Sequence, residues 1–141
     1  MWFIGFLFHE MAFGLLSVFL PLYITGQLGG SLTDFGIMVA VANIVAVPFS
    51  FFWGYLCDET KRYRIYILLS FSAVGVLLFL FSLTSVVAVL IVLYAVIAVF
   101  HVAHEAPKNV LISEYYSRPE WERSFASYEA LTELGWLTGL I

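Results

Sequence analysis

Ionisable side chains interrupt several long apolar runs of this sequence. Histidine and glutamate stand together at 9–10 and again at 104–105, and two more glutamates, Glu129 and Glu133, are four residues apart. A charged group inside a lipid bilayer costs several kcal/mol unless it faces a cavity or a partner. Imidazole and carboxylate groups exchange protons near neutral pH in partly desolvated surroundings. The two histidine–glutamate pairs therefore predict a polar cavity that binds a solute or carries a coupling proton.

The candidate residues for such a cavity come from separate runs. His101, His104 and Glu105 are spaced so that they share one stripe of a helix with Lys108. At 1.5 Å per residue, Glu10 lies about 13 Å from the start of its run and Glu105 about 15 Å from the end of its own, so both reach one depth. We expect the substrate or proton-coupling residues to be Glu10, His9, Asn43, His101, His104 and Glu105.

The same residues also allow a purely structural interpretation. The groups would then pair with one another as structural links between helices, with Lys108 neutralising Glu105 or Glu129. Histidine and glutamate also ligate metals, but the chain has a single cysteine, Cys57, and lacks an HExxH helix. We therefore expect no metal site and no cofactor. No stretch resembles a phosphate-binding loop, so direct drive by ATP is not encoded.

The composition indicates where the protein resides. Hydrophobic residues make up 62% of the 141 residues and charged residues 11%, against about half and about a quarter in soluble domains. A water-soluble core of this size cannot hide so much apolar surface. The formal charge is −4 with only six basic residues, which excludes a phosphate-binding face and hence nucleic acid as a partner. The sequence predicts an integral membrane protein whose first partner is the lipid bilayer.

The elements that must position the ionisable residues are membrane helices. A bilayer core of about 30 Å takes about 20 helical residues. The glycine-rich stretch at 26–31 breaks the first run, and two capping boxes, Ser31 with Asp34 and Ser117 with Glu120, indicate helix starts. We expect one partial N-terminal bundle over residues 1–141, with helices at approximately 2–25, 32–57, 64–83, 86–116 and 118–141, the last still running at Ile141.

Basic residues predict the orientation of these helices, because lysine and arginine collect in short cytoplasmic loops. The loops at 26–31 and 82–85 carry none. We therefore expect a multi-pass protein of the cell membrane with a cytoplasmic N-terminus. All six basic residues agree with this topology: Lys61, Arg62, Arg64, Lys108, Arg118 and Arg123.

The stretch GYLCDETKRYR at 54–64 resembles the loop signature between the second and third helices of the major facilitator superfamily. The matching residues are Gly54, Leu56, Asp58, Arg62 and Arg64. Glycine lets two helices approach closely, and aspartate accepts hydrogen bonds at a helix N-terminus while pairing with arginine. The alternative is a generic positive loop on the cytoplasmic side.

Two further features are similar to that family. Glu114 and Arg123 resemble its glutamate at the end of helix four and its arginine at the start of helix five. With Asp58 and Arg62 of the loop signature they would form a charge cluster on the cytoplasmic side. We interpret this cluster as a conformational latch, since exposed ion pairs stabilise a protein by only about 0–1 kcal/mol each. Gly135 and Gly139 form a GxxxG pair in the last run, for which helix packing is a sufficient explanation.

The resemblance implies an all-α, polytopic transmembrane bundle that is the N-terminal portion of a transporter, truncated within the fifth of its twelve helices. It implies alternating-access movement of a small solute, proton-coupled or facilitated, and no enzymatic activity. The implied partners are the solute, a proton or cation, and the missing C-terminal helices. The alternative is a non-transporting membrane scaffold or assembly subunit, and a third candidate is a membrane enzyme that uses the histidines and glutamates.

Overall fold

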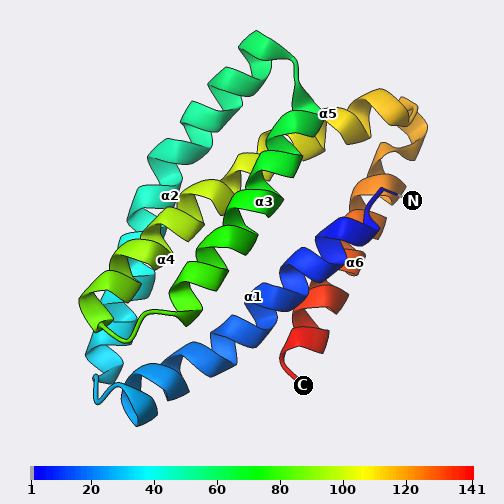
Figure 1. The fold of residues 1–141 in the computed structure, drawn as a ribbon. Coiled ribbons are helices and arrows are strands. Elements are labelled where there is room, and N and C mark those ends of the chain that lie inside the picture. Colours follow the sequence, from blue (N-terminus) through cyan, green and yellow to red (C-terminus); the bar gives the residue numbers. More distant parts are fainter. Residues whose placement is uncertain (1) are drawn as a thin grey trace.

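The computed structural model describes residues 2–141, and every regular element within that range is a helix (Figure 1). The predicted all-α class is confirmed. Four helical segments are long and apolar enough to cross a membrane: Ile4–Gln27, Leu32–Thr60, Tyr63–Ser82 and Val87–Tyr115. The α-helices are α1 (Ile4–Leu22), α2 (Leu32–Thr60), α3 (Tyr63–Ser82), α4 (Val87–His101), α5 (Glu105–Tyr115) and α6 (Trp121–Gly139).

Both capping boxes expected from the sequence are present. The Asp34 N–H donates to the Ser31 hydroxyl at 3.2 Å, and the Ser31 N–H donates to the Asp34 carboxylate at 2.7 Å. Ser117 and Glu120 repeat the pattern, with the Ser117 N–H donating to Glu120 Oε2 at 3.1 Å. Each box satisfies amides that a helix start leaves without partners, so α2 and the short 3₁₀ turn that leads into α6 begin at these serines.

Two helix ends differ from those expected. α2 continues to Thr60 instead of ending at 57, and Lys61 then adopts a left-handed conformation with φ of 53°, a common way to end a helix. α6 ends at Gly139, so the expectation of a helix through Ile141 is corrected. The final carbonyls of a helix have no following amides, so its last turn is its weakest part.

The segment expected as one helix at 86–116 is divided by a 3₁₀ turn, Val102–His104, into α4 and α5. Pro107 accounts for this turn, because proline has no N–H to donate to the carbonyl of Ala103, and its ring crowds that carbonyl. The turn changes the direction of the side chains on either side of it. It therefore sets how His104 and Glu105 face the rest of the bundle.

The helices pack in two ways. α4 packs against α2 and α3, whereas α6 lies alongside α1 (Figure 1). At the α1–α6 crossing, a Cβ added to Gly14, Gly135 or Gly139 would collide with the backbone of the opposite helix. The packing role expected for the GxxxG pair is thus confirmed, and Gly14 completes the contact from α1.

Buried apolar residues form two clusters. The larger joins the second half of α1 and the start of α2 to α3 and α4: Leu20, Ile24, Met38, Val74, Phe81, Leu90 and Ile97. The smaller joins α1, α5 and α6: Phe6, Ile112 and Tyr128. Along α1 and along α4–α5, the histidines and glutamates come between these clusters. The apolar clusters therefore hold a polar zone between them.

Candidate functional site

A polar cavity of about 480 Å³ lies between α1, α4–α5 and α6. Three of the residues expected from the sequence line it: Glu10 from α1, His101 from the end of α4, and Glu105 from the start of α5. The remaining lining residues come from α5 and α6: Lys108, Tyr128, Glu129, Thr132, Glu133 and Trp136. The fold thus gathers carboxylates from three helices around one space.

Lys108 is the cation of this cavity, and only 4% of its surface is exposed. Its Nζ atom lies 2.7 Å from Glu105 Oε2 and 4.0 Å from Glu129 Oε1, and 4.4 Å from the centre of the Tyr128 ring. Lys108 was expected to neutralise Glu105 or Glu129, and its close ion pair is with Glu105, with Glu129 at the 4.0 Å limit. Four glutamates and one lysine leave the lining with a formal charge of −3 when His101 is neutral.

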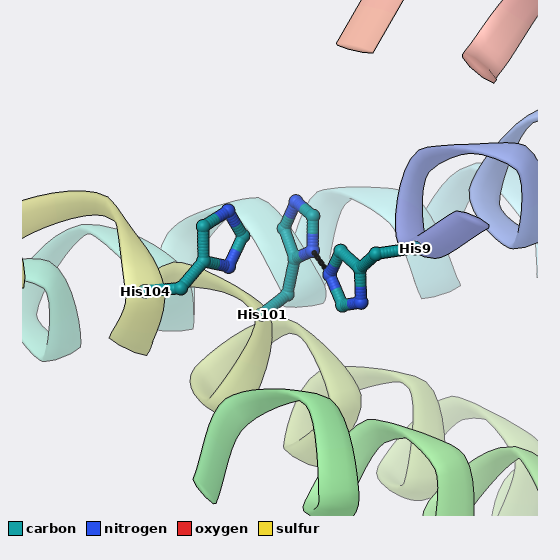
Figure 2. A group of neighbouring side chains, drawn as sticks. All are labelled: His9, His101 and His104. Atoms are coloured by element: carbon teal, nitrogen blue, oxygen red, sulfur yellow. Dashed lines mark hydrogen bonds between the residues drawn. The ribbon is translucent and has the colours of Figure 1, made fainter. Parts of the chain in front are cut away.

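The three histidines lie together, as Figure 2 shows, and His101 is the one that lines this cavity. His9 Nε2 and His101 Nδ1 share a hydrogen bond of 3.0 Å, and their rings are stacked with an angle of 9° between their planes. His104 is fully buried, and its Nδ1 atom lies 3.3 Å from the Ser70 hydroxyl of α3. His101 borders the cavity, whereas His9 and His104 are packed behind it.

Asn43 of α2 is separate from the carboxylates. It lines a smaller cavity of about 240 Å³ between α2 and α4, and His101 and Phe13 line that cavity as well. His101 therefore stands between the two spaces. Of the six expected residues, Glu10, His101 and Glu105 line the main cavity. His9 and His104 do not line it but are packed next to His101. Asn43 lines only the smaller cavity, which shares His101 with the main one.

Sequence reasoning did not assign Glu129, Glu133 or Ser70 to the site. The glutamates carried a usable signal, because two carboxylates four residues apart share one face of a helix. The estimated membrane depths of Glu10 and Glu105 concern the first and fourth apolar runs only, so the glutamates of α6 were not included in the predicted site. Ser70 gave no signal, since a single hydroxyl in an apolar helix usually bonds to its own backbone.

The residues of the loop signature at 54–64 have fewer contacts than expected. Within residues 2–141, no atom lies within 4 Å of a Cβ built on Gly54, so the close helix approach expected there is not made by this part of the chain. No ion pair within 4 Å involves Asp58, Arg62 or Arg123 across the same described range. The Arg64 guanidinium instead donates a hydrogen bond to the Tyr115 hydroxyl.

The Glu114–Arg123 pair is likewise not formed in this conformation. Glu114 lines a small cavity with Arg62 and Arg64, whereas Arg123 lines another one beside Glu120. The latch function of these residues stays a prediction.

The chain was compared with known proteins. The family model of the Major Facilitator Superfamily matches residues 2–141. No curated protein and no solved structure matched the chain. The family match spans nearly the whole sequence, and it agrees with the all-helical fold and the four apolar segments long enough to cross a membrane. The chain therefore belongs to the Major Facilitator Superfamily and is a multi-pass membrane protein of this family of transporters.

Proposed function

We propose that the cavity between α1, α4–α5 and α6 is part of the path of a small solute, which moves by alternating access in a proton-coupled or facilitated way. One observation carries this proposal: four glutamates and a lysine line one space inside an otherwise apolar helical protein. Charged groups at membrane depth are costly unless they face water, a partner or a substrate. Purely structural ion pairing would need equal numbers of opposite charges, and this lining has an excess of carboxylates.

The lining also favours a class of ligand. A volume of about 480 Å³ falls in the usual range of about 300–1,000 Å³ for small-molecule sites. The formal charge of −3 attracts cations, and the rings of Tyr128 and Trp136 offer faces for cation–π contact. The favoured ligand is a small solute with a cationic group, or a neutral solute that moves with a proton.

The orientation and the partner bundle belong to the same proposal. The Arg64–Tyr115 hydrogen bond joins the basic loop after α2 to the end of α5, so both basic segments lie at one end of the bundle. We assign that end, with the N-terminus, to the cytoplasmic side of the cell membrane. Alternating access needs a second bundle that rocks against this one, and further C-terminal helices would supply it.

The test is solute uptake into proteoliposomes that contain the product of the complete reading frame. Cationic, zwitterionic, neutral and anionic solutes are compared, each with and without an imposed pH gradient. We expect uptake of at least one cationic or neutral solute, and a loss of more than about tenfold in Glu10→Gln and Glu105→Gln. Glu122→Gln is the matched control, because this glutamate in the first turn of α6 lies outside the cavity.

Each outcome separates the alternatives. Stimulation by the pH gradient indicates proton coupling, and uptake without it indicates facilitated movement. Absence of uptake for every solute, from a correctly inserted parent protein, would contradict the proposal and favour a scaffold or assembly subunit.

A further inference from the structure

All three histidines of the chain meet at one place. His9 comes from α1, His101 from the last residue of α4, and His104 from the 3₁₀ turn that follows. One ring nitrogen from each lies within 4.8 Å of the other two, and Figure 2 shows the three rings gathered side by side. Residues that bind a common ion must converge in this way, whereas three isolated polar links would have no reason to share one spot.

His104 provides the second observation. It is fully buried, and its Nε2 atom has no hydrogen-bond partner within residues 2–141. The Glu105 Oε1 atom lies 3.3 Å away without completing a hydrogen bond. The other ring nitrogen, Nδ1, lies 3.3 Å from the Ser70 hydroxyl. One nitrogen held by a neighbour while the other makes no hydrogen bond and lies beside a carboxylate is an arrangement that a metal-ligating histidine can use.

We propose that His9, His101 and His104 bind a divalent first-row transition-metal ion of the Zn²⁺ class, with one imidazole nitrogen from each. Imidazole suits zinc, copper, nickel and cobalt, whereas magnesium and calcium prefer oxygen ligands. Zinc–nitrogen bonds of about 2.0–2.1 Å place tetrahedral ligands about 3.4 Å apart. The nitrogens lie within 4.8 Å of one another, so the most distant would have to close by up to about 1.4 Å. The His9–His101 hydrogen bond must also open, with the donor ring moving its proton to its other nitrogen, so that each ring offers a lone pair.

The fourth ligand position belongs to Glu105 or to water. The Glu105 carboxylate is already beside His104 Nε2, and it faces the cavity whose formal charge of −3 attracts cations. Ser70 is the positioning residue of the site, because its hydroxyl orients the His104 ring without touching the ion. This site goes beyond the proposed transport function, since the metal binds at equilibrium whether or not any solute moves.

The sequence expectation of no metal site rested on the absence of a local ligand motif. Here the ligands come from α1 and from the α4–α5 turn, 92 residues apart between His9 and His101. A site assembled from distant helices has no short motif, so the absence of an HExxH helix does not bear on it.

The experiment uses the purified, metal-free product of the complete reading frame in detergent. Co²⁺ is added while the visible absorption of tetrahedral cobalt is recorded, and Zn²⁺ is then added to displace it. We expect one ion per chain, and a loss of affinity of at least about tenfold in His101→Gln and in His104→Gln. Ser70→Ala should weaken binding by about tenfold while the tetrahedral spectrum remains. The matched control is Glu122→Gln, which removes a carboxylate outside the cavity and should leave the affinity unchanged.

A second measurement keeps the proposal testable where a histidine variant does not fold. X-ray absorption at the zinc edge of the loaded parent protein counts imidazole ligands directly, and we expect three. Fewer than three imidazoles, unchanged affinity in the histidine variants, or no binding of Zn²⁺ and Co²⁺ by the folded parent would overturn the proposal. The histidines would then be a hydrogen-bonded stack that supports the cavity wall.

Discussion

The α1–α6 crossing and the group formed by α2, α3 and α4 are held together by different means. The three-helix group buries Met38, Val74, Leu90 and Ile97 in one continuous apolar cluster. The crossing instead depends on glycines that let two backbones touch. The main cavity lies beside the crossing, because Glu133 and Trp136 line it and are close in sequence to Gly135 of the crossing.

This difference has a physical explanation in the bilayer. Lipid tails are as apolar as leucine, so apolar residues alone give helices little reason to choose one neighbour over another. Close packing through small residues does give such a reason, because it brings many atoms of two backbones into van der Waals contact. The α1–α6 crossing therefore holds the carboxylates of α6 against Glu10. Four predictions test this division, in order of decreasing effect.

The largest effect should follow from a large side chain at the crossing. Gly135→Leu would drive a side chain into the backbone of Leu7, and we expect a loss of about 3 kcal/mol or more of stability together with loss of solute uptake. Thermal unfolding of the purified protein measures the loss of stability. Gly75→Leu is the control, because nothing within residues 2–141 lies within 4 Å of a Cβ at Gly75. Equal losses of stability in the two variants would show that the close backbone packing at the crossing does not make Gly135 more important than a glycine with open space around it.

A cavity in the apolar cluster should cost somewhat less. Leu90 is fully buried, so Leu90→Ala should lower the free energy of unfolding by about 2 kcal/mol through lost packing. Val92→Ala, at a position that is 61% exposed, should change it little. We expect the uptake per folded molecule to be unaffected, since this cluster contributes nothing to the cavity. A selective loss of uptake in Leu90→Ala would contradict the division between the two regions.

The Lys108–Glu105 ion pair in the cavity should contribute less to stability, and its contribution is measured as the coupling energy between the two residues. Lys108→Gln and Glu105→Gln each remove one partner of the 2.7 Å contact. The double variant should be more stable than the sum of the single losses predicts, by about 1 kcal/mol. Unfolding free energies of the four proteins give this coupling energy. Strict additivity would mean that Lys108 interacts mainly with Glu129 or with the Tyr128 ring.

The smallest effect should be a pH dependence at the start of α6. Hydrogen bonds from the Ser117 hydroxyl and N–H lower the pKa of Glu120 below its usual value of 4.5. A carboxylate whose pKa falls on folding stabilises the folded state above its unfolded pKa and loses that contribution as the pH falls through the folded pKa. The protection of the amides at 117–122, which is the ratio of their intrinsic to their observed exchange rates, should therefore fall as the pH drops into acid. Ser117→Ala should remove that extra pH dependence, and an unchanged profile would exclude the capping box as its cause.

Local chemistry was open to prediction from the sequence alone. The two capping boxes depend on residues within one turn of each other, so Ser31 with Asp34 and Ser117 with Glu120 could be recognised directly. The all-α class followed from apolar runs of membrane length, and the GxxxG pair followed from its spacing. The 3₁₀ turn before Pro107 was not predicted, although a proline has no N–H for the helix hydrogen bond and therefore indicates a break in the helix near this point.

What the sequence determined by itself was thus the helices, their starts and the presence of ionisable groups inside them. Only the tertiary structure decided which of these groups meet: Glu129 and Glu133 join Glu10 and Glu105, and His9 reaches His101 and His104. The reason is geometric, because helical periodicity places a residue on a face but does not state which face meets which neighbour. That choice depends on the glycine contacts between α1 and α6 and on the turn between α4 and α5.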